Sequence, residues 1–212
     1  PIQVTETNKS AIAALLSVSN FWFWTQSGYF APAVELMPLL HTWSLAVEEQ
    51  FYLVFPLVLL AAHSLKLDAR RWVLWCLPLL FLAALFLSYQ KPAVAFYLLP
   101  ARAWELALGA ALGLGAIPAT RSARIASMLA WAGLLMLASG YLFGHSGMLF
   151  PGYVALLPCV GTALIIHCAR ATHGIGGWLA WRPLVLVGLV SYSLYLWHWP
   201  VLVFTRMATA SM

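Results

Sequence analysis

The sequence predicts an all-α fold, namely a polytopic bundle of membrane-spanning helices. Of the 212 residues, 63% are hydrophobic and only 8% are charged, whereas about a quarter of the residues of a soluble domain are charged. The mean hydropathy is +0.88. Eleven tryptophans and eight tyrosines suit a protein whose helices end at two membrane interfaces. These observations indicate an integral membrane protein.

The N-terminal region begins with an apolar segment that is too short to span a bilayer. Residues 11–24 are apolar, but a helix needs about 20 residues to cross the hydrocarbon core. We therefore expect a short interfacial or re-entrant helix, or the end of one, in this segment. A loop is expected over residues 25–40, because Gly28, Pro32 and Pro38 interrupt regular structure.

Apolar runs further along the chain predict about six transmembrane helices between residues 41 and 205. The connections between them are short, so neighbouring helices should pack antiparallel. The expected spans are 41–62, 72–89, 100–118, 125–143, 152–169 and 184–205. We expect residues 1–212 to form one integral-membrane domain, with residues 1–40 as a segment on the outer face.

The basic residues in the connections predict the orientation, because short cytoplasmic loops are enriched in lysine and arginine. Seven basic residues fall on one side of the expected bundle and four on the other. The first set contains Lys66, Arg70, Arg71, Arg121, Arg124, Arg170 and Arg182, and the second contains Lys9, Lys91, Arg102 and Arg206. The first span is therefore expected to begin outside and to run inward. We expect no nucleic-acid binding, because the basic residues serve as loop charges.

Metal binding and two common hydrolytic chemistries find no support in the sequence. The six histidines form no HxxxH or HxH pair, so we expect no metal site. The three cysteines lie in or beside apolar runs without metal-ligand spacing, where cysteine acts as a small apolar side chain. The chain contains no G-x-S-x-G, P-loop or HExxH motif, so it predicts neither a serine hydrolase nor a nucleotide-hydrolysing enzyme.

The stretch "HTWSLAVEEQFYLVFP" places Glu48 and Glu49 inside the first expected span. An ionisable group in the hydrocarbon costs at least about 2.5–3.5 kcal/mol, so such residues usually face a bundle interior or a wet cavity. Helical spacing places Glu48 on one stripe with His41, Ser44, Tyr52 and Phe55. Either this stripe relays protons or binds a polar ligand, or a glutamate pairs with an arginine of another span and only holds the bundle together.

A second pair of charges occurs in "LLPARAWELALG", where Arg102 and Glu105 are three residues apart. Side chains at this spacing can pair across one helical turn. Arg102 is expected near the outer end of the third span, at about the height of His41. The pair suits a structural salt bridge and a substrate contact equally well.

A third polar group occurs in "LVSYSLYLWHWPVLVF", in the last expected span. Ser191, Tyr195 and His198 share one helical face, and Tyr192 and Trp199 share the next. Pro200 should kink or loosen the helix, because proline lacks the N–H that a helix interior needs. A single histidine in an apolar helix is more often structural, but five polar-tipped or aromatic side chains around a kink also suit the wall of a binding site.

Three of these stretches, "PLLHTWSLAVEEQFYLVFP", "FYLLPARAWELALGA" and "SYSLYLWHWPV", together resemble the membrane acyltransferase-3 family, which includes bacterial O-antigen acetylases. With "NFWFWTQSGYF" before them, the resemblance covers nearly the whole chain. It implies a multi-pass protein of the bacterial inner (cytoplasmic) membrane. It also implies transfer of an acyl group, usually acetyl from cytoplasmic acetyl-CoA, to a hydroxyl of a cell-surface carbohydrate such as O-antigen or exopolysaccharide.

The same resemblance implies roles for individual residues. Glu48 and Glu49 would be catalytic, by orienting a histidine base or stabilising its cation. The expected substrate contacts are His41, Trp43, Ser44, Tyr52, Arg102, Glu105, Tyr192, Tyr195 and His198. The family's catalytic histidine, which follows an arginine in its first helix, and an arginine pair near the cytoplasmic face have no counterpart here. We therefore expect this chain to be a piece of a longer protein and to be inactive alone.

The expected partners follow from this resemblance. Acetyl-CoA or another acyl-CoA would act as donor substrate rather than as a bound cofactor, next to a carbohydrate acceptor and membrane lipid. In many family members an SGNH-type domain follows the last helices. Intramembrane acids and a proline-containing helix also suit a proton-coupled transporter of lipid-linked sugars or small solutes. A purely structural or sensory membrane subunit is the third alternative.

Overall fold

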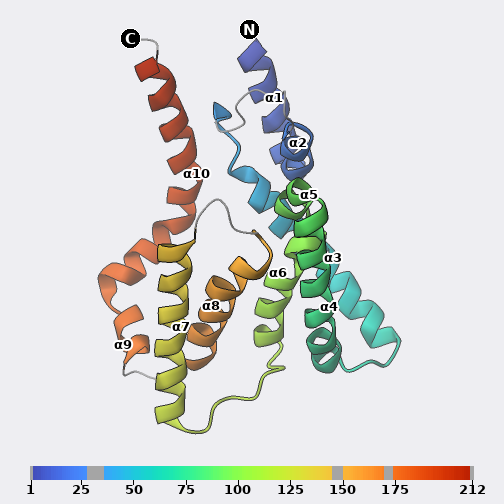
Figure 1. Cartoon of the computed structure of the whole chain (residues 1–212), viewed down its shortest axis with the longest axis vertical. Helices are drawn as coiled ribbons and strands as arrows, with labels where there is room; N and C mark the ends of the chain where they lie inside the picture. The colour runs from blue at the N-terminus through green and yellow to red at the C-terminus, as the bar shows by residue number, and fades with distance from the viewer. Residues whose placement is uncertain (1, 28–35, 145–149, 170–173, 211–212) are drawn as a thin grey trace. The chain divides into compact units, whose positions relative to one another are not determined.

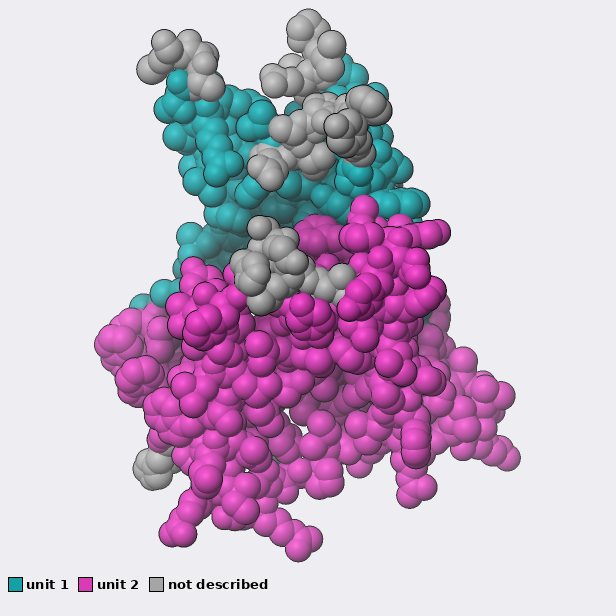
Figure 2. Space-filling model, in the orientation of Figure 1, with its two compact units in different colours: residues 1–54, 97–99, 186–212 teal, residues 55–96, 100–185 magenta. Residues whose placement is uncertain are grey.

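The computed structural model describes residues 2–27, 36–144, 150–169 and 174–210, and all regular structure in these residues is helical. The all-α prediction is therefore confirmed. Gly28 and Pro32 of the expected loop, and Arg170 of the charge count, lie outside the described residues. The chain forms two compact units (Figure 2). Unit 1 contains Pro1–Val54, Tyr97–Leu99 and Leu186–Met212, and unit 2 contains Phe55–Phe96 and Pro100–Val185.

Unit 1 begins with two helices where the sequence predicted one short helix over residues 11–24. The first, α1, is Ile2–Leu15, and the second, α2, is Ser19–Thr25 (Figure 1). They are separated at Ser17, whose φ of 57° is incompatible with a continuing right-handed helix. Both helices are too short to cross a membrane. The expectation of short N-terminal helical structure is met, but its bounds differ.

In the part of the chain that the structure describes, four helices are long and apolar enough to cross a membrane, judged by length and composition. They are α3 (Thr42–Ser64), α4 (Ala69–Gln90), α7 (Ala123–Phe143) and α10 (Arg182–Ala210). They correspond to the first, second, fourth and last expected spans, and they make the chain a multi-pass membrane protein. The side chain of Asp68 caps α4 by accepting a hydrogen bond from the Arg70 N–H at 3.0 Å, as expected for an aspartate at this position.

The third and fifth expected spans form shorter helices, so the count of six full spans is not confirmed. The third, α6 (Leu99–Gly113), has 15 residues and follows the short helix α5 (Pro92–Tyr97). The fifth, α8 (Leu156–Cys168), has 13 residues and follows the 3-10 turn η2 (Tyr153–Ala155). Helix α6 begins where its span was expected but ends early, at Gly113, because Gly115 has a φ of 66°, which does not continue a right-handed helix. Helix α8 starts late, at Leu156, because the residues before it form η2. A further short helix, α9 (Ile175–Leu179), precedes α10.

Helices α7 and α8 of unit 2 lie side by side (Figure 1). Their closest approach is at Gly133 and Gly161. A Cβ atom added to Gly133 would lie 2.6 Å from the Gly161 carbonyl oxygen, and one added to Gly161 would lie 2.6 Å from the Gly133 carbonyl oxygen. Small residues at helix crossings allow two backbones to pack directly in a membrane. This crossing therefore depends on both glycines.

Replacing Gly133 with alanine should destabilise the complete protein by about 1–3 kcal/mol, the usual cost of overpacking. The added methyl would meet backbone, which cannot rotate away. The matched control is Gly109→Ala, because a Cβ there meets nothing within 4 Å. Thermal unfolding in detergent should show a lower midpoint for Gly133→Ala only. Equal midpoints for both variants would contradict the close crossing.

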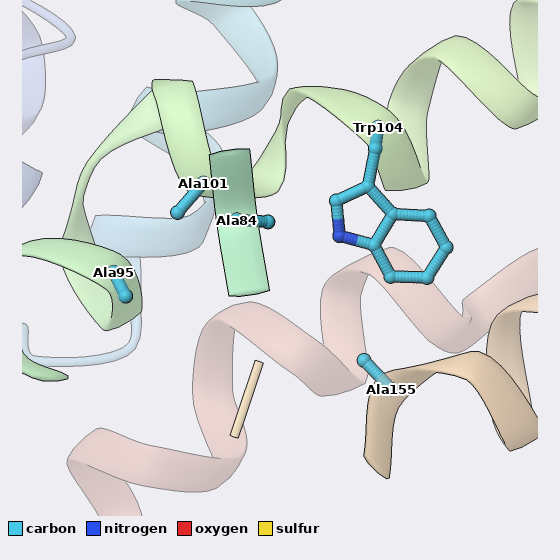
Figure 3. Packing of buried hydrophobic residues seen from close by; sticks show 5 residues of the cluster. All are labelled: Ala84, Ala95, Ala101, Trp104 and Ala155. Atoms are coloured by element: carbon cyan, nitrogen blue, oxygen red, sulfur yellow. The ribbon is translucent and has the colours of Figure 1, made fainter. Parts of the chain in front are cut away.

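A second packed region of unit 2 surrounds Trp104. The indole is buried together with four alanines, Ala84, Ala95, Ala101 and Ala155 (Figure 3). Its ring packs edge-to-face on Phe81, with centroids 5.1 Å apart. The alanines allow the surrounding helices to approach, and the one large ring fills the remaining space. This packing fixes α6, which carries Arg102 and Glu105.

Candidate functional site

Five polar side chains of unit 1 come together where α3 begins. We name them the His41 cluster: His41, Ser44 and Glu48 from the start of α3, and Tyr195 and His198 from α10. The Tyr195 hydroxyl lies 2.6 Å from the Ser44 Oγ atom and donates a hydrogen bond to the His41 carbonyl at 2.5 Å. Because a phenol has one hydrogen, the Ser44 hydroxyl must be the donor in the first of these contacts.

The His41 imidazole is held mainly by aromatic contacts. Its side chain is only 7% exposed, and its ring centroid lies 5.3 Å from that of Tyr195 and 5.7 Å from that of His198. Among the described residues, neither ring nitrogen has a hydrogen-bond partner of normal geometry. His41 directly precedes the span that starts at Thr42. Burial lowers the pKa of His41, the nearby His198 lowers it further, and the Leu196 carbonyl raises it.

The side chains of His198 and Trp199 both contact backbone carbonyls, His198 within α10 and Trp199 in the segment before α3. The His198 Nδ1 atom lies 2.6 Å from the Tyr195 carbonyl oxygen. A carbonyl only accepts, so Nδ1 carries a proton and Nε2 is the acceptor in the neutral ring. The Trp199 Nε1–H donates to the Met37 carbonyl at 2.9 Å. These contacts fix, within unit 1, the orientation of the turn of α10 that contains residues 195–199.

The two adjacent glutamates have different surroundings. Glu49 is exposed, and one of its carboxylate oxygens accepts a hydrogen bond from the Ser17 hydroxyl. Glu48 is partly buried and lies close enough to Tyr195 for an electrostatic interaction. Successive residues on a helix point about 100° apart, so one carboxylate faces the connection between α1 and α2 and the other faces α10. The sequence alone left the choice between them open.

A buried amide network next to Glu49 fixes the N-terminal helices on α3. The Gln50 Nε2 atom donates to the Ser17 carbonyl and to the Asn20 Oδ1 atom, both at 2.8 Å. The Asn20 Nδ2 atom donates to the Gln50 Oε1 atom at 3.3 Å and to the Tyr97 carbonyl at 3.2 Å. Gln50 was not among the residues predicted from the sequence. Asn20, a strongly polar residue within the apolar run "SVSNFWFW", could have indicated that a polar partner lies nearby.

In unit 2, Arg102 and Glu105 form the ion pair that their spacing predicted. The Arg102 Nη1 atom lies 3.0 and 3.1 Å from the two carboxylate oxygens of Glu105. The side chains are 12% and 20% exposed. The guanidinium also lies over the rings of Phe96 and Phe150, at 5.5 and 4.7 Å from their centroids. Such stacking stabilises a cation that is largely removed from water, and no local sequence pattern predicted it.

A groove of about 260 Å³ in unit 2 starts at Glu105. It follows one face of α6 and one face of α8, and its walls are mostly apolar. The lining residues are Glu105, Leu108, Gly109, Leu112, Pro158, Cys159, Thr162, Ala163 and Ile166. Glu105 therefore has the Arg102 guanidinium on one side and an apolar groove on the other.

The structure thus divides the predicted site residues into separate groups. It brings His41, Ser44, Tyr195 and His198 into contact, with Glu48 nearby, and it stacks Trp43 edge-to-face on Tyr97 at 5.5 Å. Tyr52 and Tyr192 are 64% and 63% exposed. No three potential metal-binding side chains converge within the described parts of the chain. The catalytic and binding roles of all these residues remain predictions.

Comparisons with known proteins agree on one family, that of membrane acyltransferases. The model of a family described as "Acyltransferase domain" (Acyl_transf_3) matches residues 10–211. The chain is 29% identical over 210 residues to the "Putative peptidoglycan O-acetyltransferase YrhL" of Bacillus subtilis (strain 168), covering 91% of the chain and 33% of that protein. It is 33% identical over 194 residues to the "Putative membrane-bound transacylase BcsY" of Komagataeibacter xylinus, covering 90% and 48%.

A third relative is the "O-acetyltransferase OatA" of Staphylococcus aureus (strain NCTC 8325 / PS 47), 29% identical over 220 residues, with 97% of the chain and 36% of that protein covered. The chain spans between a third and a half of the length of these relatives. No solved structure matches it. Because the family model matches nearly every residue, the chain belongs to the membrane acyltransferase-3 family.

Proposed function

We propose that the complete gene product is an O-acyltransferase of the bacterial inner membrane. It would move an acyl group, most simply acetyl, from acetyl-CoA to a hydroxyl of a cell-surface carbohydrate. Two kinds of support exist: the family match over residues 10–211, and relatives whose names include O-acetyltransferase or transacylase. The acceptor would be O-antigen, exopolysaccharide or, as the name of the Bacillus relative suggests for that protein, peptidoglycan.

The reaction sets the chemical demands on the site. The acceptor oxygen forms a bond to the acyl carbon, the carbon–sulfur bond of the thioester breaks, and the hydroxyl proton ends on the released thiol. A general base must take that proton, and a base of this kind typically contributes about 10²–10⁴-fold in rate. The family resemblance places the histidine base in helices that have no counterpart in this chain.

The observation that supports the proposal best is the position of Glu48. It interacts with Tyr195 of α10, whereas Glu49 accepts a hydrogen bond from Ser17. A carboxylate in such a place can orient a histidine and stabilise its cation during proton transfer, as the aspartate of a hydrolase triad does. We therefore assign to Glu48 the role of orienting the histidine base and stabilising its cation, and to Glu49 a structural role.

The proposed substrate contacts follow from the two groups of polar residues. The His41 cluster would line the reaction site in unit 1. In unit 2, Arg102 is oriented by Glu105 and two phenylalanine rings, and a guanidinium held in this way can bind donor or acceptor oxygens. Acetyl-CoA enters as a substrate and leaves as CoA, so the proposal needs no bound cofactor.

The test uses membrane vesicles that contain the complete gene product and acetyl-CoA labelled in the acetyl group. We expect label to appear in surface polysaccharide as an alkali-labile ester, because oxygen esters hydrolyse in base. Vesicles without the protein are the control. If label entered no polysaccharide of the native host, the acyltransferase proposal would be wrong and a carrier of sugars or solutes would replace it.

A further inference from the structure

Among the described residues, two side chains of the His41 cluster have ring nitrogens that can still bind a ligand, namely His41 and His198. Neither ring nitrogen of the buried His41 has a partner of normal geometry among the described residues. The His198 Nδ1 atom is used by the Tyr195 carbonyl, which leaves Nε2 as an acceptor. Pro200 lies inside α10 and has no N–H, so the Leu196 carbonyl four residues earlier lacks its usual helical partner and lies next to the His41 ring instead.

These open groups are held in place rather than mobile. The rings of His41, Tyr195 and His198 contact one another at centroid distances of 5.3 to 5.7 Å. The Tyr195 hydroxyl is fixed by Ser44 and by the His41 carbonyl. A buried polar atom without a partner costs about 1–3 kcal/mol. An imidazole held rigidly at such a cost is typical of a site that a ligand completes.

The charge of the cluster indicates which ligand completes it. Burial lowers the pKa of His41 and so favours its neutral form, Glu48 is acidic, and the cluster contains no lysine or arginine. Phosphate groups need cations or several N–H donors for binding, and here they would face a carboxylate. A hydroxyl group fits better, because it donates one hydrogen bond and accepts others. His198 Nε2 can accept, and an N–H of His41, which has no partner of normal geometry among the described residues, can donate.

We propose that the His41 cluster binds a hydroxyl group of a neutral carbohydrate, and thus forms the acceptor end of the site rather than the end that holds the phosphates of acyl-CoA. This inference rests on the proposed function, because it assigns one of its two substrates to a place. The accepting atom on α10 is His198 Nε2, and the donating group is the ring of His41.

The test compares two substitutions that each preserve a different half of the His198 ring. The amide of His198→Gln can place an acceptor near the position of Nε2, whereas His198→Asn mimics the Nδ1 side and lacks an acceptor there. The complete gene product in vesicles is given a tritiated, soluble β-1,4-linked N-acetylglucosamine oligomer, chosen because one relative is named for peptidoglycan. Glycan binding is measured by vesicle flotation, and acetyl transfer to the oligomer is measured with labelled acetyl-CoA.

We expect His198→Asn to weaken glycan binding about tenfold, the loss that corresponds to one good hydrogen bond, with the KM for acetyl-CoA unchanged. His198→Gln should retain most of the glycan affinity. His41→Gln, which removes the buried ring, should weaken glycan binding as well. The matched control is His63→Asn, an exposed histidine at the other end of α3, which should behave as the wild type in both measurements.

Two outcomes would overturn the inference: no glycan binding by the wild type, or His198 variants that change only the KM for acetyl-CoA. The second outcome leaves the acyltransferase proposal intact. If instead the wild type bound the glycan through His198 but transferred no acetyl group, the inference would stand and the proposed function would fail. The two failures are therefore distinguishable in one set of vesicles.

Discussion

Replacing Glu48 with glutamine in the complete gene product is expected to lower acyl transfer by about 10²–10⁴-fold, the contribution typical of general acid–base groups. Glutamine has nearly the same shape but cannot stabilise an imidazolium cation. Glu48 is the glutamate that lies near Tyr195, so the loss should be in the rate constant kcat more than in protein abundance. Labelled acetyl transfer in vesicles measures it, with expression checked by immunoblot.

Glu49→Gln is the matched control for this experiment, because it makes the same chemical change one residue further along α3. Its remaining carbonyl oxygen can still accept the hydrogen bond from Ser17. Most of the wild-type transfer rate should therefore survive. A loss of transfer in Glu49→Gln with full activity in Glu48→Gln would reverse the assignment. Full activity in both variants would return the two acids to a structural role.

The second large effect is expected at the ion pair of unit 2. Arg102→Met should destabilise the complete protein, because it leaves a mostly buried carboxylate without its cation. Breaking a buried ion pair in this way typically costs about 3–5 kcal/mol. We expect a loss of stability near the lower of these values, because the Glu105 side chain is still 20% exposed to solvent. The loss of stacking on Phe96 and Phe150 adds to it. The measurement is the midpoint of thermal unfolding in detergent.

The double variant Arg102→Met/Glu105→Leu provides the comparison for this prediction. Replacing both members of a buried ion pair with apolar groups is often neutral, so the double variant should be more stable than Arg102→Met alone. If its stability recovers but acetyl transfer does not, Arg102 also contacts substrate. A double variant less stable than Arg102→Met would show that the carboxylate has favourable partners other than Arg102.

The sequence predicted the fold well wherever long apolar runs decide it. The four long helices lie close to their expected positions, since about 20 apolar residues have few alternatives to a membrane helix. The two shorter helices, α6 and α8, were expected to be longer. Helix α6 ends beside Gly115, which has a positive φ, and α8 starts only after the 3-10 turn η2, where Ala155 packs in the region around Trp104. Hydropathy alone predicts neither of these local features.

The site was predictable only to the extent that helical spacing determines it. The contact of Arg102 with Glu105 and that of Tyr195 with His198 follow from a separation of three residues. The bond between Ser44 and Tyr195 joins residues 151 positions apart, and no local pattern contains such a pairing. The same limit applies to Phe150 over Arg102 and to the different environments of Glu48 and Glu49.

Two side chains of α10 hold the start of α3 by its main chain rather than by its side chains. Trp199 donates to the carbonyl of residue 37, and Tyr195 donates to the carbonyl of residue 41. A carbonyl is present whatever the side chain, so one end of each link carries no sequence requirement. A substitution at position 37 keeps the carbonyl that accepts this hydrogen bond, whereas position 199 must keep an indole N–H or an equivalent donor. Selection to keep these two hydrogen bonds therefore acts almost entirely on residues of α10.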